Sequence, residues 1–219
     1  MRVNTLLILV CVFASFWAWQ QDPAFAERQL VFSSTNLLHG RFWTLVPALF
    51  VHASPLHLFG NMLFLYVFGT TLEKNVGPAK HLLVFFTGGV LAFLLSLPFM
   101  PRGAGMLGAS AAIFTVAACV MLVSPLKFSW LFLAPQGLVA IIYFIYNVAV
   151  VYDPSRIPGY DHNVAYTAHI IGFLIGIPFG IAFSPHWKKN LLITLALFGI
   201  YLLIVSGMLG RLVEKVSGF

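Results

Sequence analysis

The sequence predicts an all-α integral membrane protein, built as a bundle of six transmembrane helices followed by one extra C-terminal helix. Of its 219 residues, 60% are hydrophobic and only 8% are charged, whereas an ordinary soluble domain carries about 25% charged residues. The mean hydropathy is +0.95. Seven apolar runs separated by turn residues supply the helices, since one bilayer crossing needs about 20 apolar residues.

The apolar runs give the expected helices in chain order. They cover residues 4–20, 57–72, 80–99, 109–124, 128–151, 164–184 and 190–210. The second and fourth runs are short, which indicates helices that begin below the membrane surface after irregular backbone. We expect one integral membrane domain over residues 1–219, with a six-helix core over about 4–184 and the added helix over about 190–210.

The N-terminal run has two interpretations. Arg2, the apolar run and Ala24-Phe25-Ala26 together resemble a secretory signal with its cleavage site. Trp17 and Trp19, near the end of the run, are typical of anchors at a membrane interface and favour a retained first helix.

The connections and the charge indicate a lipid environment. The segment 21–56 contains the apolar stretch 42–51, which predicts an amphipathic loop partly embedded in the membrane. The segment 152–163 is rich in Pro and Asp and predicts a flexible loop. The net charge of +6 includes no basic run longer than Lys188-Lys189, so we expect anionic lipid and no nucleic acid as a partner. The basic residues divide evenly between the two predicted faces and do not orient the chain.

Four polar residues are expected to meet inside the membrane. The second, fourth and sixth helices run in the same direction, so their N-terminal ends share one face. His57 and Asn61 begin the second helix, Ser110 begins the fourth, and His169 lies a few residues into the sixth. Each alone can be a structural group, since Ser and Asn often bond across membrane helices. An embedded histidine is rarer, and the convergence of all four favours a functional site.

The chemistry of these residues predicts nucleophilic hydrolysis. Ser110 is the expected nucleophile and His169 the general base. Every acidic residue falls in a loop or at a helix end, so we expect a dyad without a carboxylate. Phe114, four residues after Ser110, and Tyr166, three before His169, are candidates to hold the imidazole ring.

Oxyanion donors and small residues complete the expected site. The Ser110 N–H lies in the first turn of its helix, where it has no intrahelical acceptor, and His57 and Asn61 add side-chain donors. Gly108 precedes the serine, and Gly172 is the first of a ridge of glycines that lets two helices touch. Because hydrolysis needs water, we expect a hydrophilic cavity above Ser110.

The sequence supports a zinc site or a transporter less well than it supports nucleophilic hydrolysis. His52, His57 and His169 could ligate zinc, but no acidic or thiolate ligand joins them and the H-E-x-x-H pattern is missing. We therefore expect no metal and no cofactor. In a transporter, the half-helices near Gly103–Gly108 would need a bound ion or substrate, and no embedded carboxylate supports proton or sodium coupling.

The chain resembles the rhomboid family of intramembrane serine proteases over roughly residues 40 to 180. The matching residues are His52, His57-Leu58-Phe59-Gly60-Asn61-Met62, Glu73 with Gly77, Gly108-Ala109-Ser110, and Ala168-His169 with Gly172 and Gly176. The extra helix after His186-Trp187-Lys188-Lys189 resembles a six-plus-one arrangement that some members have.

The resemblance implies a rhomboid-like bundle that cleaves transmembrane protein substrates within or beside their membrane segments. It implies that Ser110 is the nucleophile, that His169 is the base, and that His57, Asn61 and the Ser110 amide stabilise the oxyanion. It further implies that the fifth helix and the 152–163 loop move to admit substrate, and that the site faces the extracytoplasmic side of a cell membrane. The alternative is a non-catalytic member that binds membrane helices, although such proteins generally lack the serine or the histidine.

The chain departs from the family pattern at two places. Ala111 follows the serine where the family often has glycine, and we expect its methyl group to tighten the cavity. Many members carry a Trp-Arg pair in the first loop, but here Trp43 is followed by Thr44, with Arg41 two residues earlier.

Overall fold

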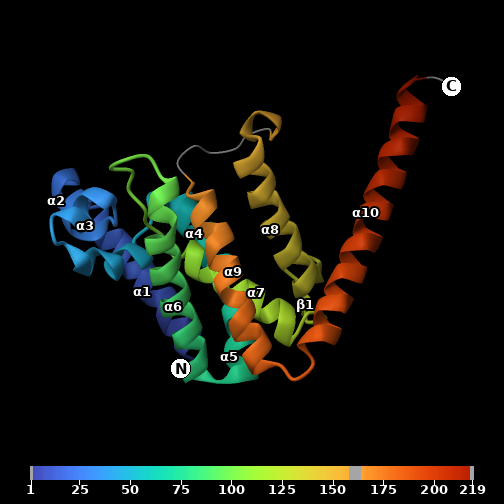
Figure 1. Cartoon of the computed structure of the whole chain (residues 1–219), viewed down its shortest axis with the longest axis horizontal. Coiled ribbons are helices and arrows are strands. Elements are labelled where there is room, and N and C mark those ends of the chain that lie inside the picture. The colour runs from blue at the N-terminus through green and yellow to red at the C-terminus, as the bar shows by residue number, and fades with distance from the viewer. Residues whose placement is uncertain (1, 158–163, 218–219) are drawn as a thin grey trace.

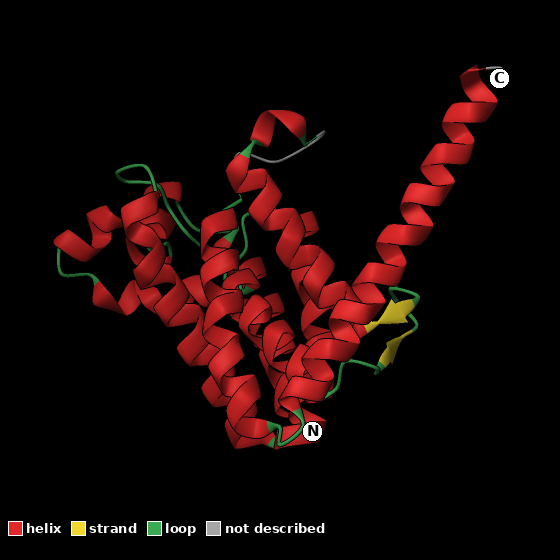
Figure 2. Ribbon diagram, turned by 45° about the vertical axis from the view of Figure 1, so that its right-hand side comes forward, coloured by secondary structure: helices red, strands yellow, loops and turns green. Residues whose placement is uncertain are grey.

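A computed structural model describes residues 2–157 and 164–217 as a helical bundle with one small hairpin (Figures 1 and 2). The α-helices are α1 (Val3–Ala18), α2 (Pro23–Leu30), α3 (Ser34–Leu38), α4 (Pro55–Phe64), α5 (Thr70–Val76), α6 (Pro78–Ser96), α7 (Ser110–Val123), α8 (Gln136–Tyr152), α9 (Tyr166–Phe183) and α10 (Trp187–Ser217). The short elements are η1 (Phe42–Leu45), η2 (Pro47–Leu49), η3 (Leu65–Gly69), η4 (Leu97–Phe99), η5 (Pro154–Arg156), β1 (Phe128–Ser129) and β2 (Ala134–Pro135).

The helices confirm an all-α membrane protein. Four segments are long and apolar enough to cross a membrane, namely Pro55–Val76, Pro78–Phe99, Tyr166–Phe183 and Trp187–Gly207. Three shorter apolar helices, α1, α7 and α8, stand where the remaining apolar runs were predicted. The first of the long segments joins α4, the π-helical turn η3 and α5 into one span. The count of seven crossings stays a prediction.

Helix α7 lies in the middle of the bundle and carries the proposed nucleophile at its N-terminus. Eleven of its 14 residues are buried, and it contacts α6, α8, α9 and α10 (Figure 1). Its length of about 21 Å is less than the roughly 30 Å of the hydrocarbon core. Irregular backbone therefore precedes it, and protein satisfies that backbone: Gly108 N–H donates to the Ala48 carbonyl at 2.7 Å, and Met106 pairs with Phe32. The irregular backbone expected before this helix is accordingly observed, while its starting depth in the membrane stays a prediction.

Helix α1 is built into the bundle. The carboxylate of Glu73 accepts hydrogen bonds from the backbone N–H groups of Val3 and Asn4, both at 2.9 Å, and so caps the start of α1. The Asn4 side chain donates to the Leu65 carbonyl at 2.9 Å, inside the π-helical turn. Leu7 and other buried side chains of α1 belong to the main hydrophobic core. These contacts favour a retained first helix.

Three predicted helix boundaries differ clearly from the structure, one of them the end of the second helix, predicted at residue 72 and observed at Val76. The run 128–151 is helical only from Gln136, because residues 128–135 form the β1–β2 hairpin, with Leu133 at a φ of +50°. Pro135 explains the start of α8, since the residue before a proline is disfavoured in a helix and the proline fits just before the first turn. Helix α10 runs to Ser217, beyond the predicted end at 210, and extends away from the rest of the bundle (Figure 1). Only 6% of an 18-residue window within Trp187–Gly207 is buried.

The long connections contain only short helices in the described residues. The segment 21–56 folds into α2, α3, η1 and η2, on the side of the bundle opposite α10 (Figure 1). Leu38, Phe42 and Trp43 are exposed on it, which suits an amphipathic surface, while its membrane embedding stays a prediction. In the predicted loop 152–163, η5 is followed by residues 158–163, which lie outside the described residues.

Candidate active site

The structure joins Ser110 and His169 by a hydrogen bond. Ser110 is the first residue of α7, and His169 lies in the first turn of α9. The Ser110 Oγ atom lies 2.7 Å from His169 Nε2. This is the distance at which a hydroxyl can pass its proton to an imidazole.

The close packing of α7 against α9 makes this distance possible. A Cβ atom at Gly172 would overlap the Ala111 carbonyl, and one at Gly176 would overlap the Thr115 carbonyl. The two backbones therefore touch, as the predicted glycine ridge requires. Thr115 Oγ1 also donates to the Gly172 carbonyl at 2.8 Å and holds the two helices together.

Gly108 shapes the turn that leads into Ser110. Its φ of +109° lies in a region that glycine favours, and a Cβ atom there would lie 2.9 Å from His57 Cε1. The next residue, Ala109, donates its N–H to His52 Nε2 at 3.3 Å. Both the conformation and the space at position 108 thus require glycine.

His52 anchors this turn to the first helix. Its Nδ1 atom lies 3.1 Å from Ser15 Oγ, and its backbone N–H donates to the same hydroxyl oxygen. Burial, helped by the neighbouring His57, lowers the pKa of His52 to about 3. The ring is therefore neutral near pH 7, which lets Nε2 accept the hydrogen bond from Ala109.

Three side chains surround the imidazole of His169. Phe114 stacks on it, with the ring centroids 4.6 Å apart and an interplanar angle of 10°. Tyr166 meets it edge-on, at 6.2 Å and 76°. Asn147 Oδ1 lies 2.8 Å from His169 Nδ1.

Asn147 was not predicted from the sequence as a site residue. The prediction rested on the N-terminal ends of helices that run in one direction. Asn147 stands near the C-terminal end of α8, and an antiparallel helix brings that end to the same face. An asparagine within an apolar run is the signal that could have found it.

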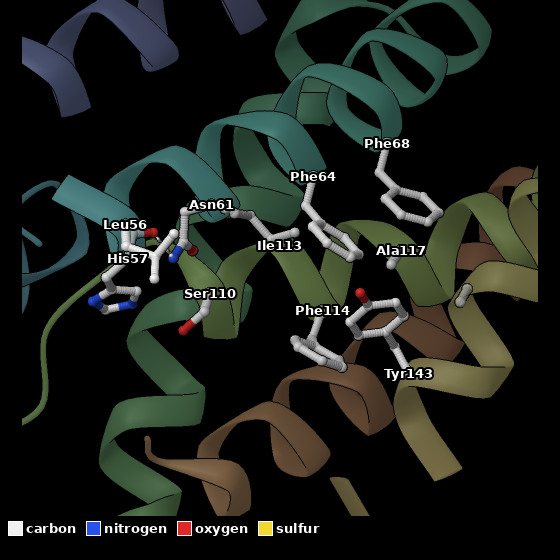
Figure 3. Close-up of a pocket in the computed structure, with 12 residues that line it drawn as sticks. Leu56, His57, Asn61, Phe64, Phe68, Ser110, Ile113, Phe114, Ala117 and Tyr143 are labelled. Atoms are coloured by element: carbon white, nitrogen blue, oxygen red, sulfur yellow. Dashed lines mark hydrogen bonds between the residues drawn. The ribbon is translucent and has the colours of Figure 1, made fainter. Parts of the chain in front are cut away.

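A cavity of about 220 Å³ opens beside Ser110 (Figure 3). His57, Asn61 and Ser110 lie at one end, while Phe64, Phe68 and Tyr143 lie toward the other (Figure 3). The expectation of a hydrophilic cavity was therefore wrong in character. Apolar side chains of α4, η3, α7 and α8 form most of its walls. Its polar groups are His57, Asn61 and Ser110 at one end and the Tyr143 hydroxyl toward the other.

His57 and Asn61 present donors to the polar end. Ser54 caps α4 by accepting the His57 N–H at 3.2 Å, with Pro55 in the first turn. The Ala53 N–H points to His57 Nδ1 at 3.4 Å, so the ring proton belongs on Nε2. Asn61 Nδ2 donates to the His57 carbonyl at 2.9 Å, and its buried Oδ1 has no hydrogen-bond partner among the described residues.

Ala111 and Arg41, where the sequence departs from the pattern of the family, both lie outside the lining of the cavity. Ala111 is buried in a hydrophobic cluster that includes Ala168, and it does not line the cavity. The expectation that its methyl group tightens the cavity was wrong, because this side chain points away from the helix face that carries Ser110. Arg41 Nη1 donates to Asn36 Oδ1 at 2.8 Å and so stabilises the first connection.

The described residues contain no group of three or more His, Cys, Asp or Glu side chains placed to hold a metal ion. His52 and His57 lie near each other, with ring centroids 5.1 Å apart. His169, the third candidate zinc ligand, instead contacts Ser110 and Asn147.

Comparison with known proteins identifies the family. A rhomboid domain model matches residues 39–186. The chain is 28% identical over 156 residues to the rhomboid protease GluP of Bacillus subtilis. The aligned stretch covers 71% of this chain and 30% of GluP. It is 30% identical over 125 residues to rhomboid-like protease 3 of Toxoplasma gondii, covering 53% and 40% of the two chains.

A plant protein is similar over a shorter stretch. The chain is 39% identical over 89 residues to the chloroplastic rhomboid-like protein 11 of Arabidopsis thaliana, covering 41% of this chain and 31% of that one. The chain matches less than half the length of each of these relatives. It is a membrane protein that belongs to the rhomboid family.

Proposed function

We propose that this protein is an intramembrane serine endopeptidase, which hydrolyses peptide bonds in or next to the transmembrane segments of other membrane proteins. The observation that carries the proposal is the 2.7 Å contact between Ser110 Oγ and His169 Nε2 beside the cavity. Relatives named rhomboid protease support the same class of activity.

In the proposed reaction, Ser110 Oγ attacks the carbonyl carbon of the scissile peptide bond while its proton passes to His169 Nε2. The C–N bond then breaks as His169 gives this proton to the leaving amine. An ester between Ser110 and the new carboxyl end remains. Water attacks that ester with His169 again as the base, which releases the acid and restores the serine hydroxyl.

The negative charge that develops on the carbonyl oxygen during the attack must be stabilised by hydrogen-bond donors. The Ser110 N–H lies in the first turn of α7, where the helix dipole also favours negative charge. His57 Nε2–H and the second N–H of the Asn61 amide reach the same end of the cavity. We assign these three donors to the oxyanion, and a lost donor typically costs about 100- to 1,000-fold in rate.

The apolar end of the cavity is proposed to hold a hydrophobic side chain of the substrate next to the scissile bond. A cavity of about 220 Å³, whose apolar end is bounded by Phe64, Phe68 and Tyr143, suits such a group. The surrounding partners would be the lipid bilayer and transmembrane protein substrates. By analogy with the rhomboid family, the protein would lie in a cell membrane with Ser110 toward the extracytoplasmic face.

The test is a proteolysis assay on a model transmembrane substrate, with the full chain in liposomes. We expect cleavage by the wild-type protein and a loss of at least about 1,000-fold in both Ser110→Ala and His169→Ala. Cleavage that persists in either variant would refute the assignment. Substrate that is bound but never cleaved by the wild-type chain would instead indicate a non-catalytic protein that binds membrane helices.

A further inference from the structure

We propose that Asn147 is a positioning residue for His169, which fixes the tautomer and the rotation of the imidazole that the proposed proteolysis needs. This inference rests on the proposed function. It adds a third side chain, from α8, to a pair drawn from α7 and α9. The sequence offers no carboxylate for this place, and here a neutral amide occupies it.

The hydrogen bonds of Asn147 determine which of its amide atoms faces the histidine. Asn147 Nδ2 donates to the Tyr143 carbonyl at 2.7 Å, one helical turn earlier on α8. If the amide were turned over, its oxygen would face that carbonyl oxygen, and two acceptors would meet. The Oδ1 atom therefore faces His169 Nδ1, at 2.8 Å.

An oxygen at Nδ1 decides where the single proton of neutral His169 sits. Oδ1 can only accept, so Nδ1 carries the proton and donates it. The lone pair is then on Nε2, which faces the Ser110 hydroxyl at 2.7 Å. The opposite tautomer would place a proton on Nε2 and block it as a base.

Burial makes this contact decisive. Asn147 is 2% exposed and His169 is 8% exposed, so water has little access to Nδ1 as a substitute acceptor. Phe114 stacks on the ring and restricts its plane, but a stacked phenyl group is equally compatible with a ring turned over by rotation about its Cβ–Cγ bond. Only a directional hydrogen bond removes this rotation, and among the described contacts of Nδ1 the one to Asn147 does so.

The neighbours of His169 contribute few charges that would compete with this effect. Among the described residues, the titratable and charged groups on the elements around its end of α9 are those of His57 on α4, Tyr143, Tyr146 and Tyr152 on α8, Tyr166 on α9, and the ion pair of Asp153 and Arg156 that follows α8. On α6, Lys80 lies over the ring of Phe183, at the opposite end of α9. A change at position 147 should therefore act directly on His169.

The experiment compares three substitutions in the full chain. Asn147→Leu keeps a similar side-chain size without an acceptor, Asn147→Asp keeps an acceptor and adds charge, and Asn190→Leu is the matched control. Asn190 also bridges two helices, with Nδ2 donating to the Leu122 carbonyl at 2.7 Å, but it does not contact the site. We measure kcat and KM on the model substrate, their pH dependence, and the thermal midpoint of each variant.

We expect Asn147→Leu to lower kcat by roughly 10- to 1,000-fold while KM changes less than about threefold. Asn147→Asp should recover most of that loss and move the acidic limb of kcat/KM to higher pH, because a carboxylate favours the imidazolium. Asn190→Leu should lower the thermal midpoint and leave kcat unchanged. A wild-type kcat in Asn147→Leu, or an Asp variant as inactive as the Leu variant, would overturn the proposal.

A second measurement separates this inference from the proposed function. Nitrogen-15 chemical shifts of labelled histidine, assigned to His169 by difference with His169→Ala, report the tautomer directly. We expect the proton on Nδ1 in the wild-type protein and a mixture of tautomers in Asn147→Leu. A proton on Nε2 in the wild-type protein would overturn the inference, even if cleavage were observed. The expected tautomer in a chain that cleaves nothing would refute the proposed function alone.

Discussion

The His57 ring fills the space that a side chain at position 108 would need, since a Cβ atom there would lie 2.9 Å from His57 Cε1 and 3.0 Å from Nε2. The turn at Gly108 and the ring of His57, the proposed oxyanion donor, are thus in close contact. A side chain added at position 108 must displace the His57 ring, which changes the distance from His57 to Ser110.

Replacing Gly108 by Ala should therefore lower activity more than stability. We expect a loss in kcat of at least about 10-fold, because the methyl group pushes His57 away from the oxyanion. Gly40→Ala is the matched control. Its φ of +73° is also positive, but no atom lies within 4 Å of the added Cβ, so it reports backbone strain without the clash. Equal kcat in the two variants would contradict this explanation.

Replacing Gly172 by Ala should damage both stability and activity. Its methyl group would overlap the Ala111 carbonyl and force α9 away from α7, which lengthens the contact between Ser110 and His169. We expect a fall of several degrees in the thermal midpoint and a marked loss of kcat. Gly199→Ala in α10 has no atom within 4 Å of the added Cβ, so it should leave kcat unchanged and should not lower the thermal midpoint.

Filling the apolar end of the cavity should alter substrate binding. Ala117 lines this cavity between Phe68 and Phe114, and Ala117→Leu takes up part of its volume. For substrates with a large apolar side chain beside the scissile bond, we expect kcat/KM to fall about 10-fold, while small side chains are affected less. The exposed Val148 on α8 supplies the control, as Val148→Leu. Equal losses for large and small side chains would argue against this binding role.

The lowered pKa of His52 predicts a loss of stability in acid. Its folded-state pKa of about 3 lies below its ordinary value of 6.5, so the unfolded chain binds the proton more readily. The stabilisation is present above pH 6.5 and is lost as the pH falls toward about 3, by up to about 1.4 kcal/mol per pH unit. Thermal unfolding of wild-type and His52→Gln proteins between pH 7 and pH 4 measures this. The two proteins should show different slopes, and identical slopes would exclude His52 as the cause.

The sequence was sufficient to predict which helix ends would meet. Helix direction alone placed His57, Asn61, Ser110 and His169 at one face, and the described structure has these residues together at one end of the bundle. Such an argument works because a membrane helix has only two possible directions, and its polar residues are few enough to be compared one by one.

The hairpin, the role of Asn147 and the apolar cavity could not be predicted, because they depend on packing between helices that the sequence pattern does not determine. The run 128–151 is apolar both in the hairpin and in α8, so composition could not separate them, although Pro135 marked the boundary. Asn147 required knowledge of the rotation of α8 about its axis, which decides whether that side chain faces His169 or lipid. The apolar character of the cavity follows from side chains on α4, α7 and α8, which meet only in the folded bundle.

The central claim is that His169 activates Ser110, and the rate at which a fluorophosphonate modifies Ser110 tests it most directly. The full chain is labelled in liposomes, and the site of the adduct is identified by mass spectrometry, in the wild-type protein and in His169→Ala. We predict an adduct on Ser110 that forms at least about 100-fold more slowly in the variant. An unmodified Ser110 in the wild-type protein, or an equal rate in the two proteins, would contradict the claim.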